Sequence, residues 1–181
     1  MIERERRGKV LLSIARDGIA DRLGTARCGR WPEPWLEERA ATFVTLRLAG
    51  DLRGCIGSLE AVRALGEDVY DNARAAAYRD PRFPPVGDRE RDGLEVEISI
   101  LSQAEPIAAA TESDALAALR PGLDGVVLQF RERRATFLPQ VWEMMPDALT
   151  FLSELRVKAH LPARFWDPGL RLARYTVEKY R

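Results

Sequence analysis

The sequence contains very few of the side chains that bind metals or form disulfides. Among 181 residues there are one histidine, His160, and two cysteines, Cys28 and Cys55. A histidine-rich metal centre is therefore excluded. The cysteines match neither a CxxC zinc motif nor a disulfide framework, although the two could still pair with each other. The cysteine cluster that holds an iron–sulfur centre is also missing, so we expect no metal and no cofactor.

Long apolar runs are absent as well. No stretch approaches the roughly 20 apolar residues that span a bilayer. The first residues, MIERERRGK, are charged and are not followed by the apolar run of a secretory signal. We therefore expect no membrane segment and a cytoplasmic protein.

Lysine is scarce, with three lysines against 25 arginines. A lysine retained in such a chain can be needed as a compact ammonium group. Lys158 falls in the last turn of a predicted helix, where pairing with the helix dipole explains it equally well. Both interpretations stay open.

The formal net charge is zero, but the charges are unevenly distributed. The first 30 residues carry eight Arg or Lys against four Asp or Glu, and residues 156–181 carry seven against two. A basic surface built from both ends would suit a nucleic acid. However, the chain lacks the basic and aromatic motifs of RNA-binding modules, and basic ends packed beside an acidic middle explain the pattern more simply. Nucleic-acid binding is therefore disfavoured.

The order of helical and strand patterns predicts an α+β fold, with mostly antiparallel sheets and flanking helices. Strict alternation over Leu94–Leu101 predicts a strand, with Leu94, Val96 and Ile98 on one face. The other elements are predicted, in chain order, as a helix over 3–23, a hairpin over 42–56, a helix over 64–78, a helix capped by Thr111, a hairpin over 124–139, helices from 139 and over 147–160, and a strand around 170–177.

The stretch LRGCIGSLE, residues 52–60, is the first candidate for chemistry. Gly54 and Gly57 frame Cys55 without Cβ atoms, so a ligand or another strand can approach the backbone, and free N–H groups there could bind an anion. Arg53 would favour the thiolate, which is the nucleophilic form of cysteine. The other interpretation is a buried thiol at a β-bulge. Spacing alone favours the latter, because free cysteines are among the most buried residues.

A cysteine nucleophile usually needs a base, and His160 is the only histidine available. This histidine ends a predicted helix, where an imidazolium would also suit the helix dipole. Glu95, Glu97 and Ser99 share one face of the predicted strand. They could serve acid–base chemistry or bind a cation, or they could form an ordinary polar stripe that faces water.

The stretch DPRFPPVGDRERDG, residues 80–93, predicts a loop longer than most connections, and long ordered loops are often functional. Asp80 and Arg82 in this loop could contact a polar ligand, pair with each other or cap the preceding helix.

Five motifs occur in a fixed order between Phe43 and Leu161: FVTL…GDLRGCIGSLE, DPRFPPV, LEVEISIL, DGVVLQF and ATFLPQVWEMMP…FLSELRVKAHL. In this combination the chain resembles the AMMECR domain family, whose bacterial and archaeal members are called AmmeMemoRadiSam system protein A. The resemblance covers most of the chain, so we expect residues 1–181 to form a single AMMECR-type domain. It implies an α+β fold of two lobes with a cleft between them, and the sequence does not locate the lobe boundary.

The resemblance also implies partners and site residues. It implies association with a Memo-like protein and a radical SAM enzyme, but no particular reaction, so the chain is not assigned as an enzyme. The positions that match family motifs are Arg53, Gly54, Cys55, Ile56, Gly57, Asp80, Pro81, Arg82, Phe83, Glu97, Ser99, Pro139, Gln140, Trp142 and Lys158. The last motif usually reads KAGL and here reads KAHL, so a family-wide mechanism does not depend on a Cys55–His160 dyad.

Together these observations predict a protein that acts with a Memo-like protein and a radical SAM enzyme through an RGCIG site. Cys55 is the candidate nucleophile of this site. The expected ligand contacts are Arg53, Gly54, Ile56, Gly57, Asp80, Arg82, Glu97, Gln140 and Lys158. The alternatives are an interaction module in which the cysteine only shapes the sheet and, less favoured, a nucleic-acid-binding protein. The oligomeric state stays open.

Overall fold

The computed structural model describes residues 2–25, 31 and 33–181, and the chain divides into two compact units. The first unit comprises residues 1–101 and 178–181, and the second comprises residues 102–177. The second unit is therefore an insertion between two strands of the first, a boundary that the sequence did not locate. Among the described residues, no helix is long and apolar enough to cross a membrane.

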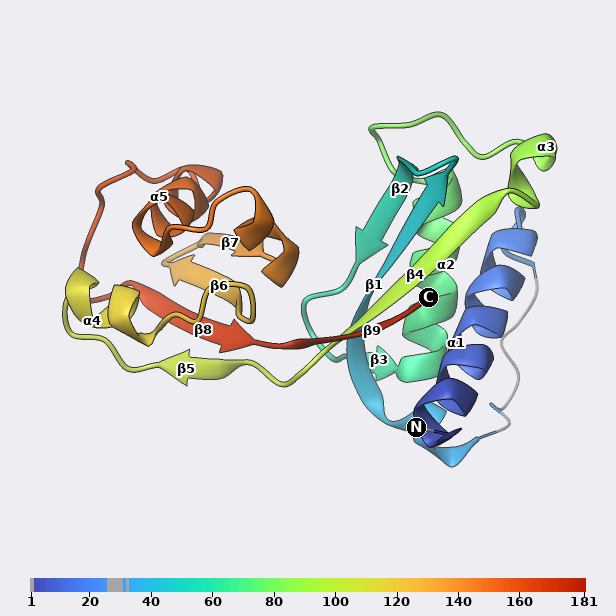
Figure 1. Cartoon of the computed structure of the whole chain (residues 1–181), viewed down its shortest axis with the longest axis horizontal. Coiled ribbons are helices and arrows are strands. Elements are labelled where there is room, and N and C mark those ends of the chain that lie inside the picture. Colours follow the sequence, from blue (N-terminus) through green and yellow to red (C-terminus); the bar gives the residue numbers. More distant parts are fainter. Residues whose placement is uncertain (1, 26–30, 32) are drawn as a thin grey trace. The chain divides into compact units, whose positions relative to one another are not determined.

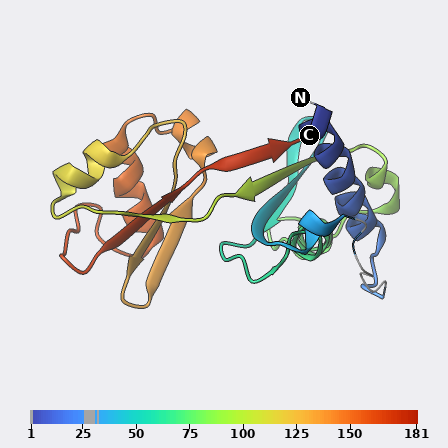
Figure 2. The same ribbon diagram turned by 90° about the horizontal axis from the view of Figure 1, so that it is seen from below.

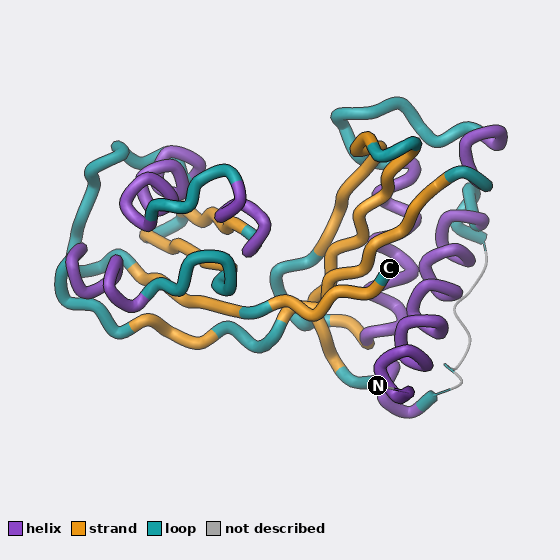
Figure 3. Tube along the Cα trace, viewed as in Figure 1, coloured by secondary structure: helices purple, strands orange, loops and turns teal. Residues whose placement is uncertain are grey.

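The first unit combines a five-stranded sheet with helices (Figures 1 and 3). Its helices are α1 (Ile2–Ala20), α2 (Leu65–Tyr78) and the short α3 (Asp88–Arg91), and a 3-10 turn, η1 (Pro34–Glu37), precedes the first strand. Its strands are β1 (Arg39–Leu48), β2 (Asp51–Gly57), β3 (Arg63–Ala64), β4 (Leu94–Leu101) and β9 (Val177–Tyr180). They lie in the order β2-β1-β4-β9, with β3 beside β1. Strand β1 runs antiparallel to β2, β3 and β4.

Side-chain alternation gives this sheet two different faces. Val44 of β1 and Ile98 of β4 are fully buried in a cluster with apolar residues of α1 and α2. Helix α2 packs against both β1 and α1. The strand register aligns Cys55, Thr45 and Glu97 across β2, β1 and β4, on the face opposite to this core. The predicted orientation of β4 is thus confirmed for its apolar residues.

A buried polar network fastens α2 to the sheet. The carboxylate of Asp68 is fully buried, and its Oδ2 atom accepts hydrogen bonds from the N–H and hydroxyl of Thr42 (2.8 and 2.7 Å) and from Asn72 Nδ2 (2.9 Å). Its Oδ1 atom accepts from the Ser58 hydroxyl (2.7 Å) and from Arg63 Nη2 (2.7 Å). Hydrogen bonds to both oxygens offset the desolvation of this charge. Sequence reasoning missed the network, although two polar residues spaced by four on an apolar helix face indicate such a pair.

The second unit consists of a four-stranded sheet, two helices and a 3-10 turn. The strands are β5 (Glu105–Ile107), β6 (Gly125–Phe130), β7 (Arg133–Phe137) and β8 (Arg171–Tyr175), in the order β5-β8-β6-β7 with antiparallel neighbours. The helices are α4 (Glu112–Ala118) and α5 (Ala148–Lys158), and η2 (Pro139–Glu143) is the 3-10 turn. Trp142 of η2 stacks on Phe151 of α5, with ring centroids 3.8 Å apart. The predicted Thr111 cap is confirmed, because the Thr111 hydroxyl accepts from the Asp114 N–H at 3.2 Å.

The α+β class is confirmed, but several details differ from the sequence-based prediction. The loop expected over 80–93 contains the short helix α3, and strands β3 and β5 were not predicted. The single strand expected around 170–177 is two strands, because the chain leaves the sheet of the second unit after Tyr175 and enters that of the first as β9 (Figure 2). Helix α1 ends at Ala20 rather than at Leu23. Cys55 is a free thiol, so the disulfide that the sequence left open is not formed; Cys28 lies outside the described residues.

Helix α5 ends in a residue with a left-handed backbone conformation, which is a position that suits glycine. His160 has a φ of 58°. The N–H of Leu161 donates to the Arg156 carbonyl (2.9 Å), and the His160 N–H donates to the Val157 carbonyl (2.9 Å). These two bonds form a Schellman cap, in which glycine adopts the required backbone conformation without steric cost.

Replacing His160 with glycine should therefore stabilise the protein. The substitution relieves a left-handed conformation that costs about 1–2 kcal/mol for most residues. It also adds about 0.4–1 kcal/mol of chain entropy to the unfolded state. We expect a net gain of a few tenths to about 1 kcal/mol in the free energy of unfolding, measured by urea denaturation. His160→Ala is the matched control and should give no gain; destabilisation by His160→Gly would show that the imidazole itself stabilises the cap.

Candidate functional site

Cys55 lies on the sheet face of the first unit that is opposite to the helices. It pairs with Thr45 of β1, and its Sγ atom lies 3.4 Å from Thr45 Oγ1. The register shifts between Leu46 and Arg47 of β1, which makes Arg53 the extra residue of a β-bulge in β2. The bulge expected at the cysteine is thus two residues earlier, and Cys55 is partly exposed rather than fully buried.

Close contacts within the chain explain why glycine stands on both sides of Cys55. A Cβ atom on Gly54 would lie 2.1 Å from the carbonyl oxygen of Ala76 in α2, and one on Gly57 would lie 2.3 Å from the ring of Phe43. Ile56 pairs with Val44 and packs partly buried against the core. The glycines of RGCIG therefore let the backbone of α2 and an aromatic ring approach β2.

Asp80 and Arg82 close the outer edge of β2 at the cysteine. The Cys55 N–H donates to Asp80 Oδ2 at 2.8 Å, and Arg82 Nη2 donates to the Cys55 carbonyl at 3.2 Å. The two side chains are also paired, with Arg82 Nη2 at 2.7 Å from Asp80 Oδ2. They supply the acceptor and the donor that a further strand would supply. The expectation of a free N–H at Cys55 for anion binding is therefore wrong.

These contacts shift the titration of Asp80. The Arg82 guanidinium lowers the pKa of Asp80 well below its ordinary value of 3.8, and hydrogen bonds from the backbone of Cys55 and Arg82 lower it further, against the effect of burial. Among the alternatives left open for the pair, the structure has Asp80 and Arg82 bound to each other. Both also hold the backbone of the cysteine.

A second ion pair anchors the start of the same strand. Arg53 Nε and Nη2 donate to the two carboxylate oxygens of Glu90 at 2.8 and 3.0 Å, and Arg53 Nη1 donates to the Pro84 carbonyl at 2.9 Å. The Arg53 guanidinium lowers the pKa of Glu90 to about 2, helped by a hydrogen bond from the Gly87 N–H. Sequence reasoning missed Glu90, since nothing in the loop composition distinguishes it from its charged neighbours. Arg53 thus binds the 80–93 loop to β2.

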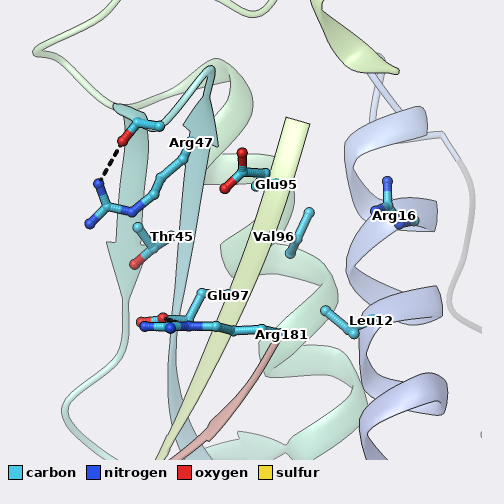
Figure 4. Close-up of a pocket in the computed structure, with 9 residues that line it drawn as sticks. Leu12, Arg16, Thr45, Arg47, Glu95, Val96, Glu97 and Arg181 are labelled. Carbon is cyan, nitrogen blue, oxygen red and sulfur yellow. Dashed lines mark hydrogen bonds and ion pairs between the residues drawn. The ribbon is translucent and has the colours of Figure 1, made fainter. Parts of the chain in front are cut away.

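Glu97 lines a pocket beside β4 whose volume is about 550 Å³. Its carboxylate pairs with Arg181 at 2.5 Å and with Lys179 at 3.7 Å. Thr45, which contacts the Cys55 thiol, also lines the pocket, as do residues of α1 and β1 that the sequence did not single out (Figure 4). Within the described part of the chain, no three His, Cys, Asp or Glu side chains form a metal-binding group.

The remaining predicted contacts, Gln140 and Lys158, belong to the second unit. The Oε1 atom of Gln140 is buried and has no hydrogen-bond partner among the described residues. Lys158 Nζ donates to the Thr136 carbonyl at 3.0 Å and lies 5.0 Å from the centre of the Phe137 ring. Burial lowers the pKa of Lys158.

Removing the Asp80 charge should weaken the fold at neutral pH and less so in acid. Asp80→Asn leaves Arg82 without its carboxylate, and we expect a loss of about 1–3 kcal/mol in the free energy of unfolding at pH 7. Because the pKa of Asp80 is lowered by folding, its stabilisation is present above pH 3.8 and is lost as the pH falls toward the folded pKa. The difference between wild type and variant should therefore shrink below about pH 4 in urea titrations.

The control for this experiment is Asp88→Asn, which alters an exposed aspartate of α3 that is paired with Arg91. It should change stability by less than about 0.5 kcal/mol at either pH. An equal effect of both variants, or a difference for Asp80→Asn that does not depend on pH, would contradict the assigned role of Asp80.

Comparisons with known proteins agree with the fold and the motifs. A family model described as AMMECR1 matches residues 12–180 and thus reaches into both units. A protein of Methanothermobacter thermautotrophicus is 38% identical over 176 residues, covering 94% of this chain and 92% of its own, and one of Thermotoga maritima is 39% identical over 152 residues, covering 83% and 82%. The crystal structure of an uncharacterized protein from Pyrococcus horikoshii superimposes with a TM-score of 0.84 at 34% identity, over 95% of this chain and 89% of that one. On these grounds the chain belongs to the AMMECR1 family.

Proposed function

We propose that the sheet face around Cys55 is a binding site for a substrate, ligand or partner. In this proposal the protein is cytoplasmic and acts with the Memo-like and radical SAM proteins that the family resemblance implies. The observation that carries the proposal is a free, partly exposed thiol on a sheet face opposite to the core. A cysteine needed only for packing is usually fully buried.

Rigid surroundings support this proposal. Cys55 is held by β1 on one side and by Asp80 and Arg82 on the other, and the Arg53–Glu90 pair fixes the strand two residues earlier. Backbone fixed by so many contacts positions a side chain precisely enough for recognition or covalent chemistry. Side chains, rather than another strand, close the edge.

The chemical role of the thiol is proposed as a candidate nucleophile, without an assigned base. The Arg82 guanidinium is a nearby cation, but it is already paired with Asp80. His160 is not proposed as the base, because it occupies a cap position with a φ of 58° that suits glycine. A base from the substrate or from a partner protein would complete the site.

Gln140 and Lys158 are proposed as ligand contacts of the second unit. A buried carbonyl oxygen without a partner, such as that of Gln140, is costly unless a bound group donates to it. Lys158 contributes an ammonium group with a lowered pKa and with the Thr136 carbonyl as its hydrogen-bond acceptor.

The alternative function is an interaction module in which Cys55 only shapes the sheet. It is favoured by the contacts of Arg53, Asp80, Arg82 and both flanking glycines, which internal packing explains without a ligand. The two functions differ in whether the thiol reacts while the protein is folded.

Alkylation of Cys55 separates them. In a Cys28→Ser background Cys55 is the sole thiol, and we expect iodoacetamide to label it much faster than the protein unfolds, because the side chain is partly exposed. Addition of the Memo-like and radical SAM proteins should slow the labelling by about tenfold or more, the effect of burying the thiol in a complex. Rates are measured by intact-mass spectrometry against unfolding rates from denaturant jumps.

Cys55→Ser and Cys55→Ala provide the matched variants, since both should keep the fold. Loss of partner binding in both variants would support a contact made by the thiol itself. Loss of binding in Cys55→Ala alone would support a polar contact that the serine hydroxyl can replace. Labelling no faster than unfolding would reject the binding site and leave the interaction module. Unchanged labelling with both partners present would reject the proposed partnership at this face.

A further inference from the structure

Strand β4 is longer than β9, the strand that lies along its outer edge. Ser102, just after β4, donates its N–H to the carbonyl of Thr176, just before β9, at 2.9 Å. At the other end of β9, Arg181 lies 2.5 Å from the carboxylate of Glu97. The two strands therefore run antiparallel, and β9 ends before it reaches the first residues of β4 (Figure 4).

The strand register shows which backbone groups of β4 face this uncovered edge. The N–H and C=O of Cys55 point away from β1, because both are bound by side chains beyond β2. Its register partner Thr45 therefore directs its own N–H and C=O toward Glu97 of β4, and Glu97 returns them. Since these groups alternate in direction along a strand, the N–H and C=O of Val96 point outward, away from β1.

The outward groups of Val96 have no strand beside them. Within the described part of the chain, β4 has only β1 and β9 as long neighbours, and Arg181 already lies beside Glu97. No turn or loop of the described residues bonds to the N–H or C=O of Val96. Val96 is only 7% exposed and lines the pocket beside β4, whose volume is about 550 Å³. Unpaired backbone groups in so buried a residue cost free energy, which a bound segment with matching groups would remove.

We infer that the edge of β4 at Val96 binds an extended segment of a partner protein, which continues the line of β9. In strand addition of this kind, main-chain hydrogen bonds give the affinity and alternate side chains give the specificity. The pocket lies within the first unit. The inference does not depend on the reactivity of Cys55, which does not line the pocket.

The walls of the pocket restrict the side chains of this segment. A residue opposite Val96 would point its side chain toward α1, where Leu12 supplies an apolar surface (Figure 4). The next residue would point to the other face, beside Glu95, which is exposed and has no ion pair among the residues described. Opposite charges on neighbouring strands attract each other. The segment therefore alternates apolar and basic residues.

The end of β9 already has this pattern. Lys179 and Arg181 both pair with the carboxylate of Glu97, whereas Tyr180 between them is buried in the core cluster of the first unit. A partner segment with the same alternation would repeat these contacts at Val96 and Glu95.

Amide hydrogen exchange tests whether the edge is open. In the free protein the N–H of Val96 should exchange at least about tenfold faster than that of Ile98, which also points outward but is covered by β9. Both rates can be measured by NMR spectroscopy. Equal protection of the two amides would overturn the inference, because the edge would then be closed.

The binding probe is the capped hexapeptide TVKVKT. We expect it to bind with a Kd of about 1 mM or lower in an NMR titration and to slow the exchange of the Val96 N–H. The same peptide with both valines N-methylated keeps its side chains but loses the donors that face β4, so it should not bind. The charge-reversed peptide TVEVET should bind more weakly, by about threefold or more.

Variants locate the site. Glu95→Lys should weaken the binding of TVKVKT by about threefold or more and should strengthen that of TVEVET. Glu37→Lys is the matched control, because Glu37 is an exposed glutamate of the same unit that does not line the pocket, and it should leave both affinities unchanged. Cys55→Ala should also bind normally, which separates this inference from the proposed function.

The inference is overturned if TVKVKT does not bind at about 10 mM. It is also overturned if the N-methylated peptide binds as tightly, since recognition would then not use the strand edge, or if Glu95→Lys behaves like Glu37→Lys. Binding that is lost in Cys55→Ala but kept in Glu95→Lys would assign the peptide to the cysteine face instead.

Discussion

The buried carboxylate of Asp68 is the constraint on which the first unit depends. Its hydrogen bonds join β1, the segment after β2 and α2, so the helix cannot rotate or slide without exposing a charge to an apolar interior. With α2 fixed, its Ala76 carbonyl fits against Gly54, and the loop that follows the helix begins where Asp80 can reach the N–H of Cys55. The geometry around Cys55 thus depends on the hydrogen-bond network of Asp68, although Asp68 does not contact the cysteine in that network.

The sequence predicted the elements whose pattern is local. Alternation in Leu94–Leu101 and the Thr111 cap follow from short-range rules, and both are present as expected. It could not predict that one C-terminal segment supplies strands to two sheets, because periodicity does not name the neighbour of a strand. The pairing of Asp80 with Arg82 was among the alternatives, but the contacts of Asp80 with Cys55 and of Arg53 with Glu90 escaped it, since these partners are distant in sequence. Arg16 and Arg181 meet at one pocket only through the fold.

The family motifs acquire a physical interpretation from these contacts. RGCIG and DPRF are two halves of one arrangement, in which a strand edge is completed by an aspartate and an arginine rather than by another strand. KAHL ends helix α5 in a left-handed cap, which His160 occupies at a conformational cost. These segments therefore form a rigid frame around Cys55, whose partly exposed thiol contacts Thr45 Oγ1.

The insertion of the second unit has a consequence for biosynthesis. Strand β9 leaves the ribosome only after all of residues 102–177, so until then β4 is paired with β1 alone and its outer edge is free. An exposed strand edge is a template for association with other chains. Rapid folding of the second unit would shorten the time for which the edge of β4 is exposed, because β9 could then pair with it sooner. Arg181 follows that strand, so it can line the pocket beside β4 only once β9 has been made.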